Sequence, residues 1–216
     1  MPAVGDFVSR RLPRNFLDPW DQWLQTAIAS SREQLGDSWL DNYLISPIWR
    51  FALSSAVCGA CPWCGVLMPS VDRVGRYFPL TVALPLRTGQ DPISLVVGAD
   101  RWFGELEDLA LAALNEDVDL AGFDKRLMAV QAPLPAAATR FDVPKGATPR
   151  VAWELALPSG AQERLACGLS DLLLRRLCTA YSLWWTRDEP GVGSSLLISE
   201  GLLAIERYAA MLDGDS

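Results

Sequence analysis

The sequence predicts an α/β fold, a single domain with a mixed sheet and helices on both faces. Short apolar runs typical of strands alternate with longer segments of helical periodicity along most of the 216 residues. Half of the residues are hydrophobic and nine are tryptophan, so a chain of this length can bury a large core without a metal or a disulfide.

The first strong element is a helix that begins near Asp18. Asp is a favourable N-cap, Pro19 suits the first helical position, and Gly36 ends the helix. One helical face is apolar, formed by Trp20, Trp23, Leu24, Ala27, Ile28 and Leu35. Asp100 is predicted to cap a second long helix. Helices are predicted at 18–35, 38–44, 100–115, 120–130, 162–179 and 202–212.

Apolar runs bounded by Pro, Gly and Asp predict the strands. They are expected at 48–53, 65–68, 80–86, 151–157, 182–186 and 195–199, with 93–97 open between a strand and the approach to the next helix. A Pro- and Ala-rich linker, 131–149, separates an N-terminal portion, about 1–130, from a C-terminal portion, 150–216. Each portion has few strands of its own, so we expect one domain over 1–216.

Composition excludes several classes of function. The net charge is −7, with 26 acidic and 19 basic residues, which argues against a nucleic-acid partner. The chain has no histidine, which excludes Ser-His-Asp and Cys-His catalysis and every histidine-ligated metal site. Neither a P-loop nor a GxGxxG segment occurs. The sequence therefore predicts no catalytic residue and no cofactor.

The sequence also bears on location. No apolar run approaches the roughly 18 residues of a spanning helix, and the first residues lack a secretory signal. We expect a soluble, cytoplasmic protein without membrane insertion, whose five cysteines are reduced thiols.

The stretch from Gly65 to Leu80 is the most distinctive. A strand breaks at Pro69, a charged loop follows, and an apolar segment resumes at Tyr77. We expect partner-binding residues in this loop, because Arg and Tyr are frequent interface anchors. They are Asp72, Arg73, Arg76 and Tyr77. The alternative is that Asp72 pairs with one of the arginines and holds the loop.

Two other charged segments are candidates for contact. Arg10 and Arg11 form a small basic cluster in an N-terminal arm, residues 1–14. The cluster either meets an acidic partner, is simply solvated, or makes internal salt bridges. Seven acids and no base lie between Glu105 and Asp124, forming either a solvated face or a surface for a basic partner. Within that run, Glu105 and Asp108 are the carboxylates that an enzyme could use to bind a cation.

Three cysteines with CxxCxxC spacing offer an alternative function as a metal or thiol-redox protein. Cys58, Cys61 and Cys64 are one ligand short of a structural zinc site. A redox pair needs a helix start that stabilises the thiolate, and Pro62 followed by a strand does not supply one. The simpler interpretation is a turn of small apolar side chains before a buried strand.

Several motifs together resemble one family. They are Gly5-Asp-Phe-Val-Ser-Arg-Arg-Leu-Pro13, Asp18-Pro-Trp-Asp-Gln-Trp-Leu24, Ser46-Pro-Ile-Trp-Arg-Phe51, Gly65 to Leu80, Ser182-Leu-Trp-Trp-Thr186, Glu200-Gly-Leu-Leu203 and Glu206-Arg-Tyr208. Their order and spacing resemble the TagF (ImpM) family of the bacterial type VI secretion system over nearly the whole chain. Members usually carry a Tyr-Gly-Lys-Leu-Pro-type segment before Gly-Asp-Phe, so the first strand is expected to be truncated or misassigned here.

The resemblance implies a three-layer α/β/α sandwich and a non-enzymatic accessory protein. It further implies post-translational repression of secretion-system assembly through the forkhead-associated scaffold protein of the system. It carries over no catalytic residues and does not specify the partner-binding surface, the stoichiometry or the signal that relieves repression.

Overall fold

The computed structural model describes residues 9–87, 90–114, 119–130, 165–187 and 195–213. At its centre is a five-stranded sheet with strand order β3-β2-β1-β4-β5. Every described pair of neighbouring strands is antiparallel. The strands are β1 Trp49–Leu53, β2 Trp63–Met68, β3 Leu80–Pro85, β4 Tyr181–Trp185 and β5 Leu196–Glu200.

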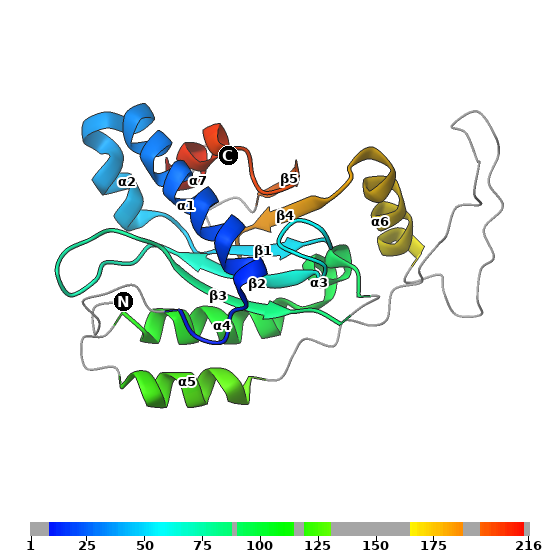
Figure 1. Cartoon of the computed structure of the whole chain (residues 1–216), viewed down its shortest axis with the longest axis horizontal. Helices are drawn as coiled ribbons and strands as arrows, with labels where there is room; N and C mark the ends of the chain where they lie inside the picture. Colours follow the sequence, from blue (N-terminus) through cyan, green and yellow to red (C-terminus); the bar gives the residue numbers. More distant parts are fainter. Residues whose placement is uncertain (1–8, 88–89, 115–118, 131–164, 188–194, 214–216) are drawn as a thin grey trace.

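Helices cover both faces of this sheet, so the predicted α/β/α layering is confirmed (Figure 1). On one face lie α1, α2 and α7. On the other lie α3 and α4, with α5 packed outside α4. The helices are α1 Arg14–Leu35, α2 Trp39–Ile45, α3 Pro92–Gly98, α4 Asp100–Ala112, α5 Leu120–Ala129, α6 Leu165–Leu177 and α7 Tyr208–Asp213, with short 3-10 turns at Gly36–Ser38 and Ile205–Arg207.

The central strands are buried on both faces and alternate between two cores. In β1, Phe51 and Leu53 enter the core beneath α1, whereas Ala52 enters the core beneath α4. In β4, Trp184 joins the first core and its neighbour Trp185 the second. This period of two explains why these segments are continuously apolar although they are strands.

The C-terminal segment is tied to the N-terminal one by indole hydrogen bonds. Trp23 donates through Nε1 to the carbonyl of Leu203 at 2.7 Å, and Trp49 donates to the carbonyl of Met211 at 3.1 Å. β4 pairs directly with β1. The strands of the C-terminal portion therefore continue the sheet that the N-terminal portion begins.

One glycine sets the spacing of the sheet. A Cβ on Gly65 of β2 would lie 1.9 Å from the backbone oxygen of Val82 and 2.9 Å from the ring of Phe51. Only glycine allows β3 and the aromatic core to approach β2 this closely.

One detail of the predicted architecture is wrong, and one that the sequence left open is settled by the structure. The five described strands form an antiparallel sheet, not a mixed one. The segment 93–97 lies in helix α3, because Asp91 caps it by accepting a hydrogen bond from the N–H of Ser94 at 2.8 Å and Pro92 begins it. The predicted strand at 151–157 and the linker 131–149 lie outside the described residues.

Two predicted helix caps are also wrong. Helix α1 begins at Arg14, so Asp18 is inside it, because the buried Phe16 packs on Trp20 and Trp63 and stabilises an extra turn. Asp100 does not cap α4 but bonds to an arginine of the sheet.

Candidate functional site

The loop between β2 and β3, residues 69–79, holds four of the six residues predicted to bind a partner. Its base is closed by an isolated bridge between Val71 and Tyr77 and by a hydrogen bond from the N–H of Phe78 to the carbonyl of Ser70 at 3.1 Å. The hydroxyl of Tyr43 contacts both the carbonyl and the N–H of Ser70 at 3.0 Å. Helix α2 therefore fixes the position of the loop.

Tyr77 belongs to this base. Its ring lies edge-on to Trp39 and Tyr43, with centroid distances of 6.0 and 5.9 Å. Because the side chain is only partly exposed, its first role is to attach the loop to α2.

Asp72 organises the loop. Its carboxylate accepts hydrogen bonds from the N–H of Val74 at 3.0 Å and from the N–H and Nε of Arg76 at 2.8 and 2.6 Å. Burial would raise the pKa of Asp72, but these hydrogen bonds outweigh it and lower the pKa below the usual value. Gly75, with φ of 83°, supplies the left-handed conformation that the turn requires. Asp72 and Arg76 thus shape the loop from within.

Arg73 and Val74 form the tip of the loop. Both are exposed, and Val74 is 64% exposed. None of the interactions among the described residues involves the guanidinium of Arg73. The loop therefore holds a cation with five N–H donors beside an apolar side chain, on a base fixed by hydrogen bonds.

Arg10 and Arg11 lie elsewhere. Both arginines pair with Asp124 of α5. The guanidinium of Arg11 donates to both carboxylate oxygens, to one of them at 2.7 Å, and Nη1 of Arg10 lies 3.7 Å from Oδ2. No described contact joins this arm to the loop. The structure brings together Asp72, Arg73, Arg76 and Tyr77, but it places Arg10 and Arg11 in an internal salt bridge.

The three clustered cysteines are separated by the sheet. Cys58 belongs to the core beneath α1 and Cys64 to the core beneath α4, whereas Cys61 is exposed. Burial raises the pKa of Cys58 to about 12 and also raises that of Cys64, so both remain protonated. Among the residues that the structure describes, no three His, Cys, Asp or Glu side chains could together hold a metal ion.

The acidic run from Glu105 to Asp124 is not one solvated face. Glu107 is buried, Asp124 binds the arm, and Asp119 caps α5 by accepting from the N–H groups of Ala121 and Gly122. Glu105 pairs with Arg101 at 3.3 Å.

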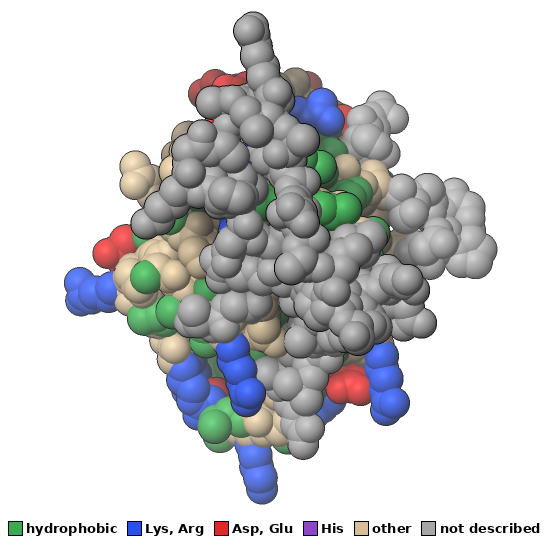
Figure 2. All heavy atoms as spheres, turned by 90° about the vertical axis from the view of Figure 1, so that its right-hand side faces the viewer, with side chains coloured by type: hydrophobic (Ala, Val, Ile, Leu, Met, Phe, Trp, Pro, Cys, Tyr) green, Lys and Arg blue, Asp and Glu red, His purple; other side chains and the backbone are tan. Residues whose placement is uncertain are grey.

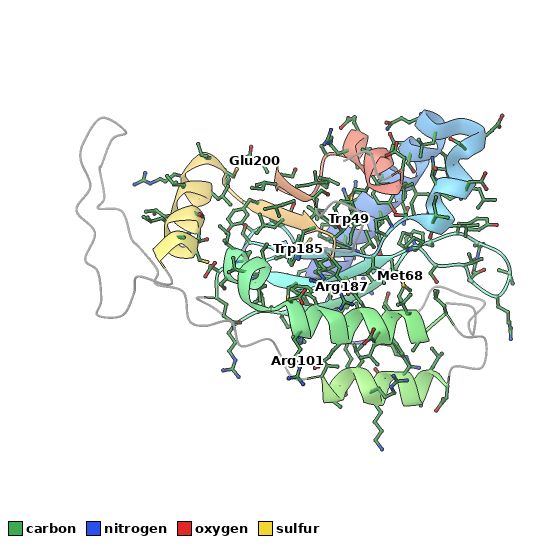
Figure 3. All side chains as sticks on the ribbon, turned by 180° about the vertical axis from the view of Figure 1, so that it is seen from behind. Trp49, Met68, Arg101, Trp185, Arg187 and Glu200 are labelled. Carbon is green, nitrogen blue, oxygen red and sulfur yellow. The ribbon has the colours of Figure 1, made fainter. Side chains whose placement is uncertain are left out.

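Sequence reasoning missed a charge cluster between the sheet and α4, in which Arg50 and Glu107 are buried whereas Asp100 and Arg187 are exposed. Arg50 of β1, 3% exposed, donates from Nε to Glu107 at 2.6 Å and from Nη1 to Asp100 at 2.6 Å. Arg187, after β4, adds a guanidinium 3.8 Å from Glu107 and lies near α4 in Figure 3. Burial would lower the pKa of Arg50, but the two carboxylates outweigh it and raise the pKa. An arginine inside a continuously apolar strand was the available signal.

Two further observations concern the surface and the helices of the described residues. On the face shown in Figure 2, the basic side chains that are drawn in colour project separately and do not form one continuous patch. None of the described helices is long and apolar enough to cross a membrane.

The relatives of this α/β/α protein place it in the class of type VI secretion-associated proteins. Residues 1–130 match the family model "TagF N-terminal domain, Type VI secretion system-associated", so the chain belongs to the TagF family. The crystal structure of PA0076 from Pseudomonas aeruginosa PAO1 is 36% identical, with a TM-score of 0.81 over 98% of this chain and 90% of that one. None of the curated proteins compared with the chain matches it. The predicted family resemblance is confirmed.

Proposed function

We propose that the protein is a non-enzymatic, cytoplasmic accessory protein of the type VI secretion system. In this proposal it represses assembly of the system after translation by binding the forkhead-associated scaffold protein. Membership of a secretion-associated family supports the association with the system. The loop between β2 and β3 supports a role in binding.

The single observation that carries the proposal is the tip of that loop. Arg73 and Val74 are exposed, while Asp72 and Tyr43 fix the backbone beneath them. Because the loop is already ordered, binding would cost little conformational entropy. An arginine is among the residues most often found to dominate the energy of an interface.

The chemistry of the chain supports a role without catalysis. There is no histidine to act as a general base near neutral pH, and the two buried thiols of the cysteine cluster are held in their protonated, unreactive form. Of the two carboxylates nominated for an enzyme, Glu105 is paired with Arg101 at 3.3 Å.

Binding of the purified scaffold protein by wild type and by the double variant Arg73→Ala/Arg76→Ala tests the proposal. We expect the double variant to bind at least about ten-fold more weakly, the loss of one good interface anchor. Arg73→Ala alone should account for most of the loss, because Arg76 acts mainly on Asp72.

The matched control is Arg101→Ala. Its side chain is 94% exposed and projects from α4 away from the sheet (Figure 3). This variant removes one positive charge, as Arg73→Ala does, and should bind as wild type. Undiminished binding by a folded double variant would reject the loop as the binding site, and no binding by wild type would reject the scaffold protein as the partner.

A further inference from the structure

The two edges of the sheet differ in the backbone groups that they present. Along β5, the N–H of Gly201 donates to the carbonyl of Ala180 at 2.8 Å, which fixes the phase of the ladder with β4. Along an antiparallel strand, the backbone N–H groups of successive residues point alternately toward the strand on one side and toward the other side. The N–H groups that point away from β4 are therefore those of Leu196, Ile198 and Glu200.

The opposite edge is blocked by proline. Next to β3, the N–H of Leu86 donates to the carbonyl of Pro62 at 2.8 Å, so the backbone of Leu86 faces β2. The residues whose backbone N–H positions face away from β2 are therefore Thr81, Ala83 and Pro85, and the alternation places Pro79, just before the strand, on the same side. Proline has no N–H, and it is one of the residues that protect an edge from pairing with another strand.

The outward row of β5 contains no proline. None of the hydrogen bonds among the described residues uses the amides of Leu196, Ile198 or Glu200. Leu196 is 50% exposed and Ile198 is 53% exposed. In register they lie opposite Trp185 and Leu183, so both side chains lie on the face of the core beneath α4. Figure 3 places Glu200 at the rim of the sheet, beyond Trp185.

We propose that β5 pairs in antiparallel fashion with β5 of a second copy of this chain. Only an extended strand can satisfy a row of outward N–H and C=O groups. Ile198 lies at the centre of the row, so a two-fold axis through it matches Leu196 with the second copy's Glu200 and engages all three amides. A two-fold contact of one patch with itself is the commonest form of protein association.

Charge and side-chain contacts support this register. The chain has a net charge of −7, so a dimer must avoid placing its carboxylates together. With the axis at Ile198, Glu200 lies opposite a leucine and is separated from the second copy's Glu200. The isoleucine meets its own counterpart, and cross-strand apolar pairs of this kind stabilise a sheet.

The expected association is weak. A contact made through one five-residue strand is expected to fall below the roughly 1,000 Å² of a stable interface, so we expect a weak association with a dissociation constant of about 1 μM to 1 mM. The inference does not depend on the proposed scaffold partner, which is assigned to a different loop.

Sedimentation of the full chain over a concentration series, up to about the 1 mM limit of such weak contacts, tests the proposal. We expect reversible, concentration-dependent dimers. Ile198→Pro removes the central outward N–H while leaving the ladder with β4 intact, and should abolish the dimer. Ala83→Pro makes the matched change on the opposite edge and should leave the dimer unchanged. The circular dichroism of each variant checks that it is folded.

A charge pair gives a second test that does not rely on proline. Ile198→Lys alone and Ile198→Glu alone should each be monomeric, because like charges face each other at the axis. Mixing the two should restore a one-to-one dimer. A wild type that stays monomeric at the highest concentration overturns the proposal, as does a dimer that Ala83→Pro abolishes equally. The proposal is also overturned if wild type remains monomeric and Ile198→Pro abolishes binding of the scaffold protein. A strand of another protein would then occupy this edge.

Discussion

Two arginine–carboxylate pairs of this protein have the same separation but different surroundings. Arg50 lies 2.6 Å from Glu107 and Arg76 lies 2.6 Å from Asp72, both through Nε. The first pair is 3% and 6% exposed, whereas the second is 46% and 12% exposed. Distance alone therefore does not show what an ion pair does. Burial determines how much stability is lost when one partner is removed.

The buried pair joins two layers. Arg50 belongs to the central strand and Glu107 to α4, so the pair fixes the helix against the sheet. The exposed pair joins two residues four positions apart within the loop between β2 and β3, and it determines only the shape of that loop. The first pair should affect the stability of the whole fold, and the second should affect the presentation of Arg73.

The largest expected effect is that of Arg50→Ala. The substitution leaves the carboxylates of Glu107 and Asp100 without their main partner and opens a cavity, which should lower the free energy of unfolding by about 3–5 kcal/mol. Urea unfolding followed by tryptophan fluorescence measures the change. The double variant Arg50→Met/Glu107→Met should recover part of the loss, because an apolar pair of similar volume replaces the ions.

The control for this prediction is again Arg101→Ala. Its exposed pair with Glu105 should contribute no more than about 0.5 kcal/mol. If Arg50→Ala and Arg101→Ala destabilised the protein equally, burial would not be the property that distinguishes the two kinds of pair.

Local sequence signals were enough for much of the fold. The periodic apolar face of α1, the strand at β1 and the break at Pro69 all follow from neighbours in the chain, and each is present in the structure. The start of α1 was predicted four residues late, because Phe16 gains its stabilisation from Trp63, which is distant in sequence. The antiparallel sheet likewise depends on the long-range pairing of β1 with β4.

The loop shows where sequence reasoning about the candidate site stops. Pro69, Gly75 and the three charges predicted a fixed turn, and the turn is there. Which arginine pairs with Asp72 depends on the exact turn, and the structure selects Arg76 and leaves Arg73 at the tip. Arg50 and Glu107 are 57 residues apart, so no local pattern could have paired them.

A smaller effect is expected from Asp100→Asn, and it should depend on pH. The hydrogen bond from Arg50 lowers the pKa of Asp100 below its ordinary value of 3.8. A carboxylate with a depressed pKa in the folded state contributes stability above its unfolded pKa, and this contribution is lost as the pH falls through the folded pKa. The difference in stability between wild type and the variant should therefore be present near about pH 6 and shrink by about pH 3.

Asp108→Asn is the control for that pH dependence. Asp108 is an exposed carboxylate of the same helix and has no arginine partner among the described residues. It should show no comparable difference between the two pH values. Parallel curves for wild type and Asp100→Asn would mean that Arg50 interacts with Asp100 too weakly to matter, leaving Glu107 as its only effective partner.

The smallest effect on global stability is expected from Asp72→Ala. The variant should shift the midpoint of thermal unfolding by no more than about 2 °C, because the loop is at the surface. Its local effect should be clear: the amides of Val74 and Arg76 lose their acceptor and should exchange with solvent faster. Asp72→Asn keeps an oxygen for these amides but loses the ion pair, so it should protect them better than alanine. If exchange were unchanged in both variants, the hydrogen bonds of Asp72 would not order the loop, and Arg73 would lack the fixed base on which its proposed role depends.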